Sequence, residues 1–447
     1  MATATALQMP LFDSETEANA YHWPERKGFF SLLVRDEEGK ARQSSHLLTD
    51  MPTVLRLVNP NRDTWLSQAE FIRPNRRVVN LARIGLLFVD IDAYKLSWAK
   101  DKTPDQMADA LKFFCADQGI PPPSLIVYSG RGLQAKWLLD SPIPRQALPR
   151  WNSCQRHLVD KLQSLGADPQ AKDASRVLRL VDTVNTKSGQ ICHVIDVEQD
   201  SSGEPVKYSF EYLAEVLLPV ARWDIEAEKR ARRSRLTVIP GGHNTGLKKF
   251  SGRQLAWDRL EDIRKLAELR GGVGEGERMK HLFWRMNFLL LSGATYSSQM
   301  FYEAQALAAE LDPNWTSRKQ ELSTLYEKAK AHERGEQIEL NGKKYAPLYT
   351  PKNDTLITLF QITDEEQLQL RTIISSNVAA ERHRKREEAR RRAAGAIDRE
   401  TYEASSLSRQ KPWEALGMSR ASWYRAGKPM PNNNETSPCV LRAERSA

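Results

Sequence analysis

The chain has 447 residues, 40% of them hydrophobic, which is enough for two or three domains with hydrophobic cores. Its formal net charge of +9 at pH 7 favours a polyanionic partner, most simply nucleic acid. Its four cysteines are scattered and include no Cys-x-x-Cys pair, which argues against a structural zinc site and a disulfide framework. Because the sequence has no membrane-length apolar run and no signal peptide, it predicts a soluble, cytoplasmic protein without a membrane partner.

The first half of the chain mixes short apolar runs with helical stretches, as expected of an α+β (α/β) domain. Helices are predicted over 103–118, opened by Thr103-Pro104, and over 145–165. Strands are predicted over 32–34, 86–91, 124–128, 136–139 and 191–197. We therefore expect one domain over 1–222, followed by a basic, glycine-rich linker over 223–252.

The second half reads as helical. We expect a helical domain over 253–335, then a hairpin at 338–345 and a long basic helix from Asp364 within a segment over 336–396. A helix-turn-helix over 397–430 and a disordered tail over 431–447 complete the prediction. The expected fold class is thus an α+β domain followed by all-α domains that include a helix-turn-helix.

An acidic pair directly follows a buried strand: Leu86 to Val89 run into Asp90-Ile91-Asp92. Residues two apart on a strand share a face, so both carboxylates project together. They repel each other unless a cation lies between them, and hard oxygen ligands favour Mg²⁺ or Mn²⁺, as in phosphoryl or nucleotidyl transfer. A strand-end turn in which either aspartate caps the next helix explains the pair equally well.

A second block is a glycine-rich turn, Ser129-Gly130-Arg131-Gly132, followed by a strand with Gln134 and Lys136 on one face. The glycines would let the backbone approach a ligand closely, and exposed amides together with the two basic side chains suit a triphosphate. A plain hairpin turn is the alternative explanation.

A third block begins at Asp173, which would complete a three-carboxylate metal site. Arg176, Arg179 and Lys187 would neutralise phosphates, and Asn185 would hold a sugar or a base edge. In the alternative, Asp173 caps a helical turn and the two arginines pair with surface acids.

In this order the three blocks resemble the archaeo-eukaryotic primase superfamily and, within it, the replication-initiator primases of plasmids and phages, over about residues 60 to 200. The resemblance implies template-directed nucleotidyl transfer with two Mg²⁺ or Mn²⁺ ions on Asp90, Asp92 and Asp173. The nucleotide-binding residues that it implies are Ser129, Gly130, Arg131, Gly132, Gln134, Lys136, Arg176, Arg179, Asn185 and Lys187.

The family often has histidine where this chain has Gln134, and glutamine cannot become cationic. Either Lys136 supplies the missing charge or the activity is reduced or altered. Farther along, Gly276-Glu277-Arg278 resembles the start of the helical domain found C-terminal to such primases.

Two features of the C-terminal part favour DNA binding. The charge run over 381–392 is explained either by a solvated helix face or by contact with nucleic acid through residues such as Arg384 and Arg391. A short apolar helix is predicted to end at Gly417, and Ser419 is predicted to cap the next one. The spacing over 415–425 is similar to that of small resolvase-type helix-turn-helix domains, with a plain helical hairpin as the alternative. Its predicted DNA-binding residues are Ser419, Arg420, Ser422, Trp423 and Arg425.

We therefore predict a plasmid-type replication initiator that binds origin double-stranded DNA and synthesises a short primer on a single-stranded template from nucleoside triphosphates. Host replicative helicase or polymerase would be further partners. One alternative is a non-catalytic origin-binding initiator with a degenerate primase fold. The other is a primase-polymerase of repair or phage-defence type.

Overall fold

The computed structural model describes residues 12–218, 249–317, 319–340, 343–394 and 407–429. The chain divides into two compact units, Met1–Ile374 and Ser375–Ala447, and each is described by itself. The predicted linker lies outside the described residues up to residue 248, and the predicted tail lies wholly outside them. No helix in the described ranges is both long enough and apolar enough to cross a membrane.

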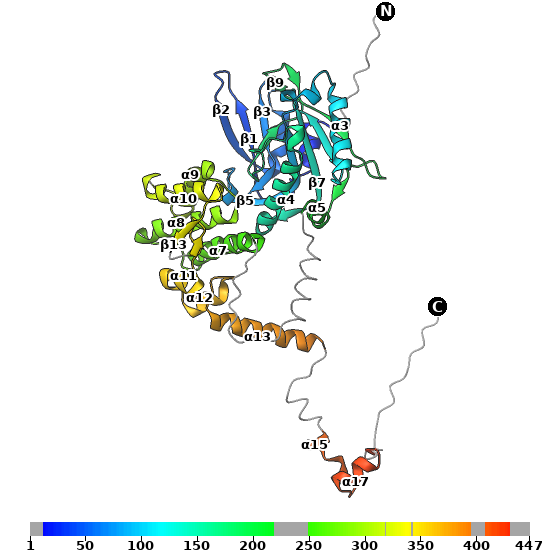
Figure 1. Cartoon of the computed structure of the whole chain (residues 1–447), viewed down its shortest axis with the longest axis vertical. Helices are drawn as coiled ribbons and strands as arrows, with labels where there is room; N and C mark the ends of the chain where they lie inside the picture. The colour runs from blue at the N-terminus through cyan, green and yellow to red at the C-terminus, as the bar shows by residue number, and fades with distance from the viewer. Residues whose placement is uncertain (1–11, 219–248, 318, 341–342, 395–406, 430–447) are drawn as a thin grey trace, which may run out of the picture. The chain divides into compact units, whose positions relative to one another are not determined.

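The first unit contains a mixed sheet, drawn in blue to green in Figure 1. Its ten strands within the described residues are β1 (Phe29–Arg35), β2 (Ala41–Leu47), β3 (Thr64–Ser67), β4 (Ala69–Phe71), β5 (Leu81–Ile91), β6 (Leu125–Tyr128), β7 (Leu133–Pro144), β8 (Val177–Arg179), β11 (His193–Val197) and β12 (Lys207–Tyr208). Eight of them follow in the order β11-β6-β7-β5-β4-β1-β3-β8, with β2 paired to β1 and β12 paired in parallel to β7.

Strand β5 lies in the middle of the sheet, between β7 and β4. Its residues Leu86 to Val89 are fully buried, which explains why the sequence there is a continuous apolar run rather than an alternating one. The register places Asp90 opposite Gln134 and Ile91 opposite Leu133 on β7. The strands predicted from apolar runs are therefore confirmed, whereas β2, β3, β4 and β8 were missed because they are short or mostly polar and exposed.

Helices pack on this sheet and fix β5 in place. Trp151 of α4 donates its indole N–H to the carbonyl of Leu86 at 2.9 Å, and Gln155 bonds both backbone groups of Phe88. The helix predicted after Thr103 begins there, with Thr103 and Gln106 forming a capping box. The helices of this region are α1 (Ser14–Asn19), α2 (Met51–Arg56), α3 (Pro104–Asp117), α4 (Leu148–Lys161) and α5 (Phe210–Leu217), with 3₁₀ turns η1 (Leu48–Asp50), η2 (Val78–Asn80), η3 (Ala93–Lys95), η4 (Ser97–Ala99), η5 (Arg145–Ala147) and η6 (Gln163–Leu165), and a small ladder of β9 (Val184–Asn185) with β10 (Gln190–Ile191).

The helical half of the first unit packs against the sheet domain, because α7 contacts α4 and α9 contacts η2. It consists of α7 (Lys249–Leu269), α8 (Arg278–Ser292), α9 (Met300–Leu311), α10 (Ser323–Glu333), α11 (Asn353–Phe360) and α12 (Asp364–Gln369), with η7 (Glu275–Glu277), η8 (Ser297–Gln299), η9 (Lys319–Leu322) and the hairpin β13 (Ile338–Leu340) and β14 (Lys343–Tyr345). The predicted fold class is confirmed, and the predicted domain boundaries stay predictions.

The predicted start of the long basic helix, at Asp364, is wrong. Helix α12 ends at Gln369, and the basic helix α13 (Ser376–Ala393) begins anew after Ser375, whose side chain accepts a hydrogen bond from the backbone of Val378. The apolar residues between the two helices, Leu370 and Ile373, are buried in the core of the first unit. Burial of this stretch, rather than helix propensity, therefore ends the first helix.

Within its described residues, 375–394 and 407–429, the second unit holds α13 and three short helices, α15 (Leu407–Gln410), α16 (Pro412–Ala415) and α17 (Arg420–Arg425). Gly417 adopts a left-handed φ of 63° after α16, and Ser419 caps α17 by accepting from the backbone of Ser422. The rings of Trp413 and Trp423 pack 5.7 Å apart and join the two helices. The local turn and cap therefore lie where the sequence predicted them.

Candidate active site

The acidic pair lies at a cavity of about 390 Å³ at the end of β5. Asp90 is the penultimate residue of this strand and Asp92 directly follows it, and both line the cavity. Asp92 precedes the 3₁₀ turn η3 but makes no side-chain capping bond, and its carboxylate is instead paired with Lys95. The helix-cap explanation of the pair is therefore not supported.

The surroundings of the Asp90 carboxylate favour binding of a cation or a proton. The pKa of Asp90 is raised to about 6. Enclosure by the surrounding protein is the main cause, the carboxylates of Asp92 and Asp168 also raise the pKa, and Arg176 and Arg179 lower it. A divalent ion would supply the positive charge that the pair lacks, and carboxylate oxygens suit Mg²⁺ or Mn²⁺. Asp90 and Asp92 therefore fit a metal ion in their chemistry and placement.

The predicted third ligand is not assembled with this pair. Asp173 lines the same cavity, but its Oδ1 accepts hydrogen bonds from the backbone and hydroxyl of Ser175, at 3.1 and 2.6 Å. Nowhere in the described ranges do three His, Cys, Asp or Glu side chains come close enough to hold a metal ion. The local-turn alternative for Asp173 is thus the arrangement found, because its carboxylate accepts hydrogen bonds within its own turn.

The glycine-rich turn joins β6 to β7 and reaches the same cavity. Ser129 donates its backbone N–H to Gly132 O at 2.9 Å, and Gly130 has a left-handed φ of 87°. A Cβ on Gly132 would lie 2.1 Å from the carbonyl of Ile91, so only glycine fits there. Ser129, Arg131 and Gly132 line the cavity, whereas Gly130 packs against Asn185. The turn is therefore a hairpin that also borders the site.

Gln134 and Lys136 share a strand face but have different surroundings. Gln134 lines the cavity, and its buried Oε1 has no hydrogen-bond partner within the described part of the chain. Lys136 is only 1% exposed, does not line the cavity, and forms an ion pair with buried Glu17 and a hydrogen bond to Tyr21. The expectation that Lys136 binds the nucleotide or replaces a histidine charge is wrong, because α1 covers this position.

The third block contributes half of the basic side chains that line the cavity. Arg176, Arg179, Asn185 and Lys187 all line the cavity. Arg176 pairs with Asp168 at 3.1 Å, and Arg179 pairs at 2.6 Å with Asp63, which is buried rather than on the surface. Asn185 donates its amide to Ser129 O at 2.8 Å and so ties the third block to the glycine-rich turn. The structure thus brings the three predicted blocks together around one cavity.

Sequence reasoning missed several lining residues. Arg76 and Arg77 precede η2, and the basic run Arg73-Pro-Asn-Arg-Arg77 was the available signal for them. Two aromatic residues flank the site: the guanidinium of Arg131 lies 3.9 Å from the ring centre of Tyr94, and that of Arg179 lies 4.8 Å from the ring centre of Trp65. Gln299 of the helical half also lines the cavity, and no local motif indicated it.

The predicted DNA-binding residues of the second unit are placed differently from one another. Arg420 and Arg425 are exposed on α17, and Arg384 and Arg391 are exposed on α13. Ser419 and Ser422 bond each other as parts of the helix cap. Trp423 is fully buried against Trp413, so its assignment as a DNA-contacting residue is wrong. Its size and apolar surface are used to pack α16 on α17.

Comparisons with known proteins identify the family to which the chain belongs. No protein-family profile matches it. A replication protein of Clostridium perfringens is 32% identical over 315 residues, which are 70% of this chain and 69% of the relative. Solved structures that resemble it include the AEP domain of the cyanophage S-2L primase-polymerase (18% identity, TM-score 0.32, 43% of this chain and 89% of that one), primase RepB′ (16%, 0.28, 71% and 92%), and the catalytic domain of primase RepB′ in complex with initiator DNA (16%, 0.27, 50% and 100%). By its identity and coverage with the Clostridium relative, the chain belongs to that replication-protein family, which agrees with the replication role that the resemblance from the sequence motifs implied.

Proposed function

We propose that this protein is a replication initiator of the plasmid type that synthesises a short primer by template-directed nucleotidyl transfer. The observation that carries the proposal is the convergence, on one cavity, of an acidic pair on a central strand and a wall of arginines and a lysine. An acidic pair suits a divalent ion, and arginines suit the phosphates of a nucleoside triphosphate. The proposal is consistent with membership of a replication-protein family.

Each side chain has a role in this proposal. Asp90 and Asp92 would hold Mg²⁺ or Mn²⁺, which would supply activation of the attacking 3′-hydroxyl and neutralisation of the leaving pyrophosphate. Arg131, Arg176 and Lys187 would bind triphosphate oxygens or template phosphates from the cavity wall. The unpartnered Oε1 of Gln134 would accept a hydrogen bond from a hydroxyl or amino group of the nucleotide, a neutral contact in place of a histidine charge.

The acidic pair favours the catalytic proposal over the non-catalytic alternative. Two carboxylates at one cavity destabilise each other unless a cation or a proton offsets their charge. The pKa of Asp90 is raised to about 6, mainly by burial and in smaller part by the charge of Asp92, so both effects disfavour its ionised form at neutral pH. A fold that only binds DNA would not need this arrangement.

The second unit would bind origin duplex through the exposed arginines of α13 and α17, and it would do so as a helix-turn-helix. Tethering this unit to the proposed primase domain would raise the effective concentration of the catalytic site at the origin. This coupling favours an initiator over a primase-polymerase of repair or phage-defence type, which would act on any template.

Primer synthesis tests the proposal directly. The full chain would be incubated with labelled nucleoside triphosphates, Mg²⁺ or Mn²⁺, and single-stranded template, with and without origin duplex. We expect a short product that increases with origin duplex and disappears in the double variant Asp90→Asn/Asp92→Asn. The control Asp109→Asn removes an exposed carboxylate of α3 and should leave synthesis unchanged. Undiminished synthesis by the double variant refutes the catalytic role, no product from wild type indicates a binding module, and long products on any template indicate a polymerase.

A further inference from the structure

The helical half contributes to the candidate active site through one buried acid. Glu303 of α9 is 1% exposed, and its two carboxylate oxygens accept hydrogen bonds from the backbone N–H groups of Val78 and Val79, each at 3.1 Å. These are the first amides of η2, which have no partner within the turn itself. A carboxylate is the side chain that satisfies two adjacent amides at once.

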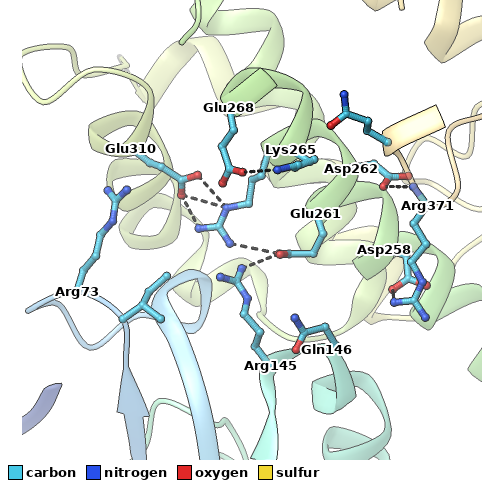
Figure 2. Close-up of a pocket in the computed structure, with 13 residues that line it drawn as sticks. Arg73, Arg145, Gln146, Asp258, Glu261, Asp262, Lys265, Glu268, Glu310 and Arg371 are labelled. Carbon is cyan, nitrogen blue, oxygen red and sulfur yellow. Dashed lines mark hydrogen bonds and ion pairs between the residues drawn. The ribbon is translucent and has the colours of Figure 1, made fainter. Parts of the chain in front are cut away.

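The acceptor side of the same turn is also held by the helical half. Arg264 of α7 donates to the carbonyl of Val79 at 3.0 Å. Its guanidinium is fixed by Glu310 of α9, at 2.9 Å, and by Glu261, which reaches across to Arg145 at 2.6 Å. Figure 2 shows Glu310, Glu261 and Arg145 along this chain of charged contacts between the sheet and the helices. Both hydrogen-bonding ends of η2 are therefore held by α7 and α9.

The turn that these helices hold directly follows two cavity residues. Arg76 and Arg77 both line the candidate active site, and Arg77 is the residue that precedes η2. The guanidinium of Arg77 lies 4.9 Å from the ring centre of Tyr302, the neighbour of Glu303 on α9. The backbone of η2 and the ring of Tyr302 thus set where this cationic side chain lies.

We propose that Glu303 is a positioning residue: by holding η2, it keeps Arg77 at the cavity, where the guanidinium group of Arg77 binds the triphosphate of the incoming nucleotide. The helical half is then part of the nucleotide site rather than an appendage to it. The ligand class in this inference rests on the proposed function. The competing explanation is that Glu303 only joins the two halves of the unit, without effect on Arg77.

Binding of ATP or dATP with Mg²⁺, measured by calorimetry without template, separates these explanations. Glu303→Gln replaces one acceptor with a donor and so removes one of the two hydrogen bonds. We expect it to weaken binding about five- to tenfold, as the loss of one charge-assisted contact does. Glu327→Gln makes the same chemical change at an exposed position of α10 and should leave binding unchanged.

A double-mutant cycle tests whether Glu303 acts through Arg77. The variant Glu303→Gln/Arg77→Ala should bind no more weakly than Arg77→Ala alone. Val78→Pro provides a second route, because it removes the donor of the same contact, and proline is tolerated at the first position of a helical turn. It should weaken binding to a similar extent and also add nothing to Arg77→Ala.

The outcomes are distinct. Unchanged binding by both Glu303→Gln and Val78→Pro, or losses that multiply with that of Arg77→Ala, would overturn the positioning role while leaving the proposed function intact. Absence of nucleotide binding by the wild-type protein would instead overturn the proposed function, and the ligand assignment with it.

Discussion

Replacing Asp90 with asparagine should stabilise the fold while it abolishes nucleotidyl transfer. Asparagine keeps the shape of the side chain and removes its charge. A pKa raised from an ordinary 3.8 to about 6 corresponds to about 3 kcal/mol of lost stability in the ionised state. Because the carboxylate retains some contact with the open cavity, we expect a gain of about 1–3 kcal/mol at pH 7.5.

The gain should depend on pH in a defined direction. The folded protein binds the Asp90 proton more tightly than the unfolded chain does, so the contribution of this group to stability is greatest below about pH 4. It falls as the pH rises from about 4 to about 6, the raised pKa, and stays at its lower level above that. The advantage of Asp90→Asn over wild type should therefore be present at pH 7.5 and absent near pH 4.

Denaturant unfolding at the two pH values measures this advantage, with Asp109→Asn as an exposed-carboxylate control. Mg²⁺ should in addition stabilise the wild type more than Asp90→Asn, because a bound ion stabilises only the state that holds it. A variant that is less stable than wild type at pH 7.5, or that gains equally at both pH values, would contradict the electrostatic account of the site.

Three further outcomes follow from the surroundings of individual residues. Lys136→Met should destabilise the fold by about 3–5 kcal/mol in denaturant unfolding, because it leaves Glu17 buried without its partner. A large loss of nucleotide affinity in a correctly folded Lys136→Met variant would instead support the predicted role of Lys136 in nucleotide binding. Gly132→Ala should lower the melting temperature and nucleotide binding together, because its methyl group would meet the carbonyl of β5, and retention of both would contradict the close packing. In fluorescence anisotropy with duplex DNA, Arg425→Ala should weaken binding and lower the slope of the logarithm of affinity against the logarithm of salt concentration by about one. Trp423→Ala should weaken binding more, because it removes the buried ring that packs α16 on α17. If Arg425→Ala bound as wild type does, this helix would not face DNA.

The sequence by itself determined the features that depend on neighbouring residues. An unbroken apolar run predicted the central strand, and the two-residue period of that strand placed Asp90 and Asp92 together at its end. Capping residues predicted where α3 and α17 begin. These features were accessible because strand periodicity and helix caps are decided within a few residues of the chain.

Only the tertiary structure decided which side chains reach the cavity. Lys136 had the right strand face, yet α1 from the start of the chain covers it and Glu17 neutralises it. Asp173 lies at the cavity but bonds its own turn, and the contact of Glu303 with η2 spans 225 residues. Burial and pairing of a charged side chain depend on elements far away in the sequence, because a charge is buried only where folding brings an opposite charge or a hydrogen-bond donor to it.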